Sequence, residues 1–322
     1  MKVSVDSNCS KPAASPSIFP ALISFAALTL VAGAAPTTSY NTGSLGPAAD
    51  GASSTGVLID QPGALPVFND FSLSYLAPDN TTVPFRPEIN PPAASPFTIE
   101  FWAWPTGSDN DDGPVSNRLG SGNRSGWVFF QRNPATGWNF RMYDGVGSNL
   151  GWDLTGGTAT LNAWSHVVAV WTGSAALLYV NGVLADSTNT DGLSGVYNPN
   201  TFKSLYIGSL VAGGSPYNGR LDEIAFYPSA LTPAKILAHF NAGSSPVPGT
   251  YSSLVKAEAP LLYLQQNPPT VSLTMAGVTP TVTFTGILAV SPDLVNWQDL
   301  TVTSPYTPPA PQPRTRFFRS HR

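Results

Sequence analysis

The chain has 322 residues, of which only 11% are charged, and it contains 29 glycines and 32 prolines. This composition is too apolar and aromatic for a disordered chain and too rich in turn-forming residues for a helical one, so it favours many short strands. A formal net charge of −4 makes nucleic acid and anionic lipid poor candidate partners.

The N-terminal segment 1–34 predicts a secretory signal peptide. A basic stretch precedes the apolar run 18–35, and small residues follow the pattern of a cleavage site near Ala34. An uncleaved membrane anchor is the alternative, disfavoured because the apolar run is short and broken by Pro20. We therefore expect a secreted or cell-envelope protein without a membrane span in the mature chain. Its only cysteine, Cys9, would be removed with the signal, which leaves no thiol for a disulfide or a metal.

The strand pattern becomes sharp at the run 97–105, FTIEFWAWP. Its side chains alternate between two faces, both of which carry large apolar groups: Phe97, Ile99, Phe101 and Ala103 on one, and Thr98, Glu100, Trp102 and Trp104 on the other. Such a strand is expected to be buried and central in its sheet. Further strand candidates follow at close intervals: SGWVFFQR, GWNFRMYDG, AWSHVVAVWTG, ALLYVNGVLADS, SLYIGSL and GRLDEIAFY.

Turn signals separate these candidates without any crossover helix. Asn181-Gly182 predicts a two-residue hairpin turn, because both central residues of such a turn need positive φ. Seven or more strands in about 150 residues with this spacing predict an antiparallel sandwich. After them, Thr232 is a plausible N-cap, Pro233 fits the first helical position and Gly243 fits the end of a short helix that docks on the sandwich.

The pattern divides the chain into four parts. Residues 1–34 are the signal peptide, 35–243 the sandwich domain, 244–268 a linker, and 269–322 a small C-terminal β module. About 55 residues form only a small core, so we expect the C-terminal module to be marginal alone.

Four stretches, in this order, resemble the laminin G-like, concanavalin A-like jelly-roll domains of exported bacterial proteins. They are FTIEFWAWPT, NAWSHVVAVWTG, LLYVNGVLADS, and YIGS followed by GRLDEIAFYPSALTPAKILAHFNAG. The resemblance covers most of residues 96–243 and implies an all-β, two-sheet antiparallel jelly-roll sandwich with a short closing helix. It also implies that a calcium site is common and that glycan or protein binding occurs in some members. The C-terminal part resembles a short tail module on exported proteins of Verrucomicrobia-like bacteria.

Asp222 and Glu223 are adjacent acids on a predicted strand. Strand neighbours point to opposite faces, so we expect that they do not act as a pair on one substrate. The favoured interpretation is structural, and metal ligation by Asp222 is the alternative.

Catalysis of the glucanase type is disfavoured by the distribution of acids. Glucanases of this fold carry acids at alternating positions of one strand, and retaining hydrolysis needs two carboxyl groups about 5–5.5 Å apart. The strand around Glu100 supplies one acid followed by aromatic residues. We therefore predict no catalytic residues.

An acidic loop at 107–117 offers candidate calcium ligands in Asp109, Asp111 and Asp112. Carboxylates on a flexible loop suit calcium, which accepts oxygen ligands in loose geometry. A solvated acidic loop is the alternative interpretation.

The histidines predict no site: His166 is expected as a packing residue, His239 lies in the last helical turn and His321 lies in the tail. Most tryptophans fall in strands and are expected in the core. Trp138 and Trp152 flank turns and are predicted to be exposed.

With Tyr143, these two tryptophans make a candidate platform for sugar rings. The sequence therefore favours a non-catalytic exported recognition module that binds polysaccharide or surface glycan, with calcium as a possible cofactor. A structural or adhesive envelope protein that makes protein contacts is the alternative, and a glycoside hydrolase ranks last.

Overall fold

The fold is described from a computed structural model. The structure describes residues 38–67, 70–107, 111–119, 122–189, 193–211, 214–265, 271–276, 279–284, 287–291, 298–302, 304–308 and 317–321. The predicted signal peptide lies outside these residues. Within them, no helix has both the length and the apolar character needed to cross a bilayer.

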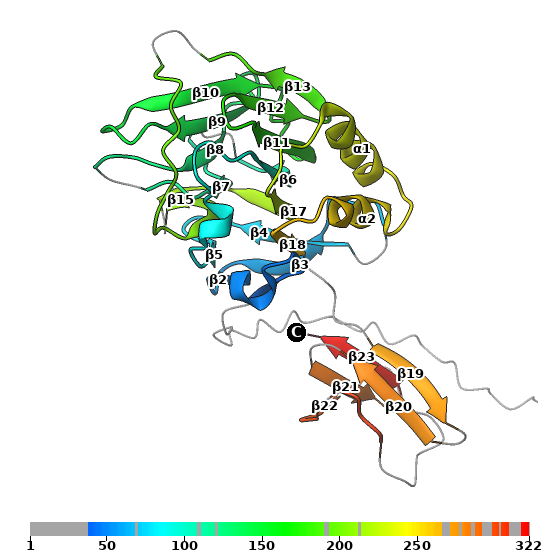
Figure 1. Cartoon of the computed structure of the whole chain (residues 1–322). Coiled ribbons are helices and arrows are strands. Elements are labelled where there is room, and N and C mark those ends of the chain that lie inside the picture. The colour runs from blue at the N-terminus through cyan, green and yellow to red at the C-terminus, as the bar shows by residue number, and fades with distance from the viewer. Residues whose placement is uncertain are drawn as a thin grey trace, which may run out of the picture. The chain divides into compact units, whose positions relative to one another are not determined.

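The first sheet of the main domain has the strand order β10–β9–β8–β7–β14–β5–β2–β1, and every pairing is antiparallel (Figure 1). Its strands are β1 (Thr38–Asn41), β2 (Gly51–Ser53), β5 (Thr81–Val83), β7 (Val115–Ser116), β8 (Trp127–Gln131), β9 (Trp138–Tyr143), β10 (Leu150–Gly156) and β14 (Leu205–Ile207). A small hairpin of β15 (Ser209–Val211) and β16 (Gly214–Pro216) follows β14.

The second sheet has the order β18–β17–β6–β11–β12–β13, with β4 and β3 continuing from β17. Its strands are β3 (Leu58–Pro62), β4 (Phe71–Tyr75), β6 (Phe97–Pro105), β11 (Ser165–Trp171), β12 (Ala176–Val180), β13 (Val183–Asp186), β17 (Gly219–Tyr227) and β18 (Leu262–Gln265). Strand β1 pairs with both β2 and β18, so the two layers are joined at that edge. The predicted antiparallel sandwich is confirmed.

The core lies between the two sheets, and the alternation predicted for β6 is confirmed. Phe97, Ile99 and Phe101 belong to the main apolar cluster, together with residues of the first sheet such as Phe129 and Phe140. The opposite face of β6 carries Thr98, Glu100 and Trp102, all of which are buried as well. A central strand that is buried on both faces requires a third layer over its outer face.

Two helices form that third layer: α1 (Pro233–Gly243) and α2 (Thr250–Ala257). They lie side by side over β6, β11 and β17 (Figure 1). The predicted start of α1 is confirmed, since Thr232 caps the helix by accepting a hydrogen bond from the backbone N–H of Lys235. A second apolar cluster fills the space beneath the helices and includes Trp102, Val168 and Ile236. Two single-turn 3-10 helices, η1 (Gly46–Ala49) and η2 (Pro87–Ile89), complete the domain.

The hairpin predicted at Asn181-Gly182 is confirmed. These two residues connect β12 to β13 and have φ values of 52° and 76°. Positive φ at both central positions matches the right-handed twist of the flanking strands, which is the requirement that Asn-Gly meets.

The linker predicted at 244–268 is wrong over its described part. This segment contains α2 and β18, and β18 pairs with β17 on one side and with β1 on the other. Its apolar side chains explain the difference, because Tyr251, Val255 and Tyr263 are all buried against the sandwich. The sandwich domain therefore continues past the predicted boundary at residue 243 to Gln265.

The described residues of the C-terminal part form short antiparallel strands, and the prediction of a separate module there stays a prediction. Strands β19 (Val271–Ala276) and β20 (Thr279–Phe284) make one hairpin, and β21 (Ile287–Ser291) pairs with both β22 (Gln298–Asp299) and β23 (Phe317–His321). Val282 and Phe284 are its buried apolar centre among the described residues.

Candidate functional site

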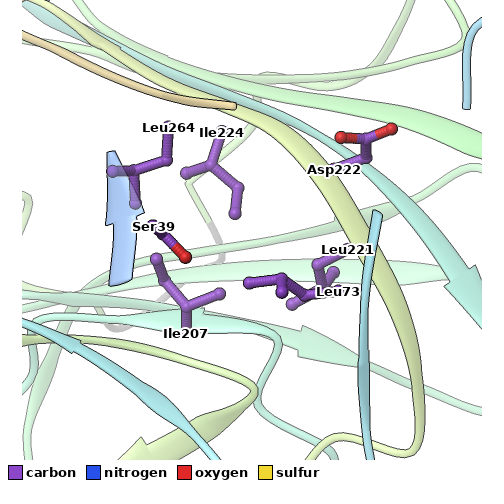
Figure 2. Close-up of a pocket in the computed structure, with 7 residues that line it drawn as sticks. All are labelled: Ser39, Leu73, Ile207, Leu221, Asp222, Ile224 and Leu264. Carbon is purple, nitrogen blue, oxygen red and sulfur yellow. The ribbon is translucent and has the colours of Figure 1, made fainter. Parts of the chain in front are cut away.

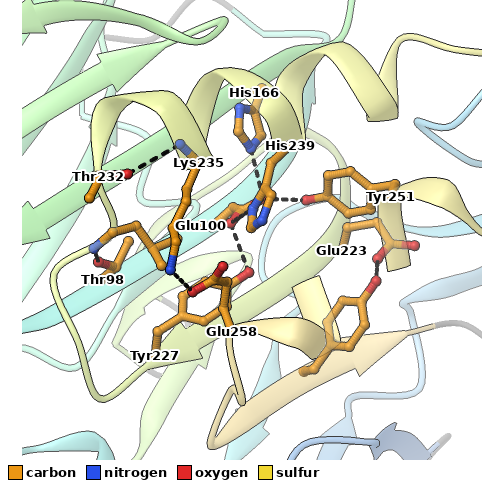
Figure 3. Close-up of polar contacts among 12 residues, drawn as sticks. Thr98, Glu100, His166, Glu223, Tyr227, Thr232, Lys235, His239, Tyr251 and Glu258 are labelled. Atoms are coloured by element: carbon orange, nitrogen blue, oxygen red, sulfur yellow. Dashed lines mark hydrogen bonds and ion pairs between the residues drawn. The ribbon is translucent and has the colours of Figure 1, made fainter. Parts of the chain in front are cut away.

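A buried polar network surrounds Glu100, at the centre of β6 (Figure 3). Its Oε1 atom accepts hydrogen bonds from His166 Nε2 on β11 at 2.9 Å and from the Tyr251 hydroxyl on α2 at 2.6 Å. Its Oε2 atom accepts from His239 Nδ1 on α1 at 2.9 Å and from the Tyr227 hydroxyl on β17 at 2.8 Å. One carboxylate thus joins three strands to both helices.

The Glu100 carboxylate is ionised in this environment. Burial raises the pKa of Glu100, but the hydrogen bonds and positive charge of His166 and His239 outweigh burial and lower it below its usual range. The pKa of His239 is raised in turn: burial lowers it, and the hydrogen bond and charge of Glu100 more than compensate. All five members of the network are buried, so none reaches a substrate in solution.

The sequence predicted no functional site at the histidines, and it did not foresee that His166 and His239 bind the same carboxylate, that of Glu100. His166 does pack as expected, with its ring centroid 4.9 Å from that of Trp102, but it also binds Glu100. The sequence did contain a signal for this, because Glu100 is the only charged residue in a run that is buried on both faces. A buried charge needs hydrogen-bonding or charged partners, and the histidines of neighbouring elements supply them.

Asp222 and Glu223 lie at a β-bulge in β17, where the strand leaves β4 and meets β18. Glu223 has a φ of 52°, which breaks the strand alternation locally. The expectation that the two side chains point to opposite faces is therefore wrong. Both carboxyl groups are buried, and their oxygen atoms approach within 4.8 Å of each other and of Asp70.

Each acid of this cluster of Asp70, Asp222 and Glu223 has local partners. Asp222 accepts hydrogen bonds from the backbone N–H groups of Ala64 (2.8 Å) and Glu223 (2.9 Å). Glu223 accepts from the Tyr263 hydroxyl. Asp70 accepts from the Leu65 N–H at 2.6 Å. The structural interpretation of Asp222 is thus supported by its contacts, and the closeness of three carboxyl groups also fits an oxygen-liganded cation.

The electrostatics of this acidic cluster favour added protons or an added cation. Burial raises the pKa of Asp70 to about 6 and that of Glu223 to about 8. Burial and the neighbouring charges of Asp70 and Glu223 raise the pKa of Asp222 well above its usual range. Either protonation or a bound divalent ion would relieve the repulsion.

The cavity beside Asp222 is too small for a sugar. It has a volume of about 10 Å³, roughly the room for one water molecule, and is lined mainly by aliphatic side chains. Figure 2 shows the Asp222 carboxylate turned away from Leu73 and Ile207. This cavity offers a substrate no path to the acids.

The prediction that Trp138 and Trp152 are exposed is wrong. Their side chains are 0% and 8% exposed, and that of Tyr143 is 1% exposed. Both tryptophans occupy inward positions of β9 and β10 and pack in the main core, because the turns that precede these strands do not interrupt their alternation. In this arrangement they present no ring face to a ligand.

The acidic loop is only partly described. Asp109 lies outside the described residues. Asp111 is exposed and forms an ion pair with Arg132, whereas Asp112 is buried and pairs through its backbone with Gln131. The structure therefore does not bring Asp111 and Asp112 together as neighbouring ligands on one surface, and neither lies in the cluster that contains Asp222.

A half-buried aromatic row lies on the outer face of the second sheet. Among the described tryptophans, only Trp104 and Trp164 are not buried. Their ring centroids are 5.6 Å apart in an edge-to-face arrangement. Arg220, paired with Trp104 across β17 and β6, places its guanidinium 4.2 Å from the Trp104 centroid and 5.1 Å from that of Trp164. We refer to Trp104, Trp164 and Arg220 as the Trp–Arg row.

A comparison with protein families finds one matching family model. Residues 79–237 match the family model described as the concanavalin A-like lectin/glucanases superfamily. No curated protein matches the chain.

The solved structures that match this chain are distant in sequence. The binding domain of Paraclostridial Mosquitocidal Protein 1 shares 16% identity with a TM-score of 0.48, over 76% of this chain and 63% of that one. Trypanosoma rangeli sialidase shares 14% with a TM-score of 0.42, over 60% of this chain and 29% of that one. A SAP-like pentraxin from Limulus polyphemus shares 16% identity with a TM-score of 0.35, over 45% of this chain and 69% of that one. This chain thus spans less than a third of the sialidase and less than two thirds of the mosquitocidal domain.

Proposed function

We propose, from the match of residues 79–237 to the concanavalin A-like lectin/glucanases family model, that the sandwich is a non-catalytic module that recognises polysaccharide or surface glycan. The observation that carries the proposal is the Trp–Arg row. It replaces the platform predicted at Trp138, Tyr143 and Trp152, whose rings are buried.

The Trp–Arg row has the chemistry that sugar recognition needs. Indole rings present apolar surface with a polar N–H, and half-buried rings hold a fixed orientation while part of each remains in contact with solvent. Arg220 donates one N–H to the carbonyl oxygen of Pro62 at 2.7 Å. A guanidinium has five N–H donors in a rigid plane, so others are available to ring hydroxyls.

The positions of the acids support binding rather than hydrolysis. A retaining hydrolase needs two carboxyl groups that face one bound sugar. Glu100 is buried, accepts four different donors and has a lowered pKa, so it is a poor general acid. Asp222 and Glu223 are each only 3% exposed.

Calcium assistance is part of the proposal. The acidic cluster supplies only carboxylate oxygens, the ligands that calcium prefers. Asp222 lies two residues from Arg220 on β17. Burial lowers the pKa of Arg220, and the charge of Asp222 offsets part of that effect. An ion held by Asp70, Asp222 and Glu223 would fix the strand that carries Arg220.

A glycan array with and without calcium tests the proposed function, using wild type, Trp164→Ala and Phe202→Ala. Phe202 is an exposed aromatic residue outside the Trp–Arg row, and it serves as the matched control. We expect retention of at least one glycan by wild type and Phe202→Ala, and its loss in Trp164→Ala. A wholly negative array would refute the proposal and favour the structural or adhesive alternative.

A further inference from the structure

We propose that a second surface, on the outer face of β8 and β9, binds acidic polysaccharide through Arg118 and Arg124. This inference goes beyond the proposed function, because it concerns the opposite sheet from the Trp–Arg row and names a chemical class of ligand. The inference rests on four guanidinium groups that make cation–π contacts with two aromatic rings.

The two rings are Phe130 on β8 and Tyr143 on β9. The guanidinium carbons of Arg118 and Arg124 lie 5.6 and 5.9 Å from the Tyr143 centroid. Those of Arg132 and Arg141 lie 4.6 and 5.5 Å from the Phe130 centroid. Both rings belong to a small apolar cluster with Val128, separate from the main core, so they point to the outer face of this sheet.

The charges on this face are not balanced. Arg132 pairs with Asp111, and Arg141 pairs with Asp153 at 3.1 Å. Within the described part of the chain, neither Arg118 nor Arg124 forms an ion pair. The face therefore has an excess of positive charge on a chain whose formal net charge is −4.

Arg118 is fixed against Tyr143 and keeps one donor without a hydrogen-bond partner. Its side chain is nine-tenths buried and donates to the Tyr143 hydroxyl at 3.3 Å, while its Nε is buried without a hydrogen-bond partner. An unpaired buried donor costs about 1–3 kcal/mol, which an anion could offset. Arg124, on the same ring, is less buried and is accessible from solvent.

Guanidinium groups bind carboxylates through paired, parallel hydrogen bonds. The Tyr143 N–H bonds to the carbonyl of Gly126, four residues before Phe130, so the two rings lie about 13 Å apart along the strands. Arg118 and Arg124 both lie over the Tyr143 ring, so the two guanidinium groups without an acidic partner are at one end of this face, where neighbouring anionic groups of a polymer could pair with them. Nucleic acid is the less suitable polyanion, because its binding depends on many phosphate contacts and only two guanidinium groups here lack an acidic partner.

The test is affinity electrophoresis of the full chain in gels with polygalacturonate, with its methyl ester, or with duplex DNA. The ester keeps the sugar backbone and removes the charge. We expect retardation by polygalacturonate alone, weakened by added salt. Arg124→Gln should weaken it about tenfold, and Lys256→Gln, a charge loss on the exposed face of α2, should leave it unchanged.

Arg118→Gln should also weaken retardation. The melting temperature of this variant shows whether it still folds. If it does not fold, Arg124→Gln alone decides the test, because Arg124 is more exposed. Trp164→Ala separates the two proposals, because it should retain polygalacturonate binding even if it loses the array glycan. Equal retardation by the methyl ester, retardation by DNA alone, or an unchanged Arg124→Gln would overturn the inference.

Discussion

Glu100 Oε2 on β6 accepts a hydrogen bond from His239 Nδ1 on α1 at 2.9 Å, with both side chains buried. The two residues are 139 positions apart in the chain, so this contact forms only when the closing helix docks on the sheet. Together with the bond from His166 it makes a buried charge part of the attachment between the sandwich and its third layer.

We predict that Glu100→Gln lowers the free energy of unfolding by about 3 kcal/mol. Breaking a buried charged network by removing one partner typically costs about 3–5 kcal/mol, and the amide retains part of the hydrogen bonding. Urea unfolding followed by tryptophan fluorescence measures the change. Glu88→Gln, at an exposed acid in η2, is the control and should be neutral. Equal stability of the two variants would show that the network does not hold the helices.

The acidic cluster predicts an unusual dependence of stability on pH. The pKa values of Asp70 (about 6) and Glu223 (about 8) are raised in the folded state, so between pH 5 and 8 the folded chain binds more protons than the unfolded one. Stability then falls as pH rises through this range. The raised pKa of His239 acts in the same direction, because its stabilisation is present below its ordinary pKa and lost as pH rises through the folded value.

Melting temperatures in EDTA between pH 5 and 8 measure this dependence. We expect a decline toward pH 8 in wild type and a flatter profile in Glu223→Gln, which removes one of the raised groups. The lowered pKa of Glu100 has the opposite sign, but its effect falls at lower pH, where protonation of the carboxylate removes its stabilisation. A rising profile from pH 5 to 8 in EDTA would contradict the assignment of repulsion to this cluster.

Calcium should raise the melting temperature more at pH 8 than at pH 5.5, because protons compete with the ion for Asp70, Asp222 and Glu223. At 100 times its Kd an ion that binds only the folded state adds about 2.7 kcal/mol. Asp222→Asn should abolish the calcium response. Asp111→Asn, in the predicted acidic loop, should preserve it. If Asp111→Asn abolished the response and Asp222→Asn preserved it, the calcium site would lie in the acidic loop. If calcium did not raise the melting temperature of wild type, the proposal of calcium binding would be refuted.

The sequence was sufficient to predict the sandwich and several local features. The alternation around Glu100, the turn at Asn181-Gly182 and the cap at Thr232 each depend on residues close together in the chain, so they were readable without tertiary contacts. The partners of Glu100 could not be predicted in this way, because they come from strands and helices far apart in sequence.

The errors have similar physical causes. The bulge at Glu223 depends on the change of partner strand along β17, which no local pattern reports. Trp138 and Trp152 follow the inward period of their strands, whereas the prediction relied on their nearness to turns. Trp104 and Trp164 are the described tryptophans that are not buried, and their position relative to turns does not report this.

The most direct test of glycan recognition without catalysis is a calorimetric titration of the array-selected oligosaccharide into wild type and Trp164→Ala. We predict a saturable isotherm for wild type and about tenfold weaker binding for the variant, since the loss of one aromatic contact is worth about 1.4 kcal/mol. Unchanged affinity in Trp164→Ala, or a continuing heat of turnover from cleavage of the sugar, would contradict the account.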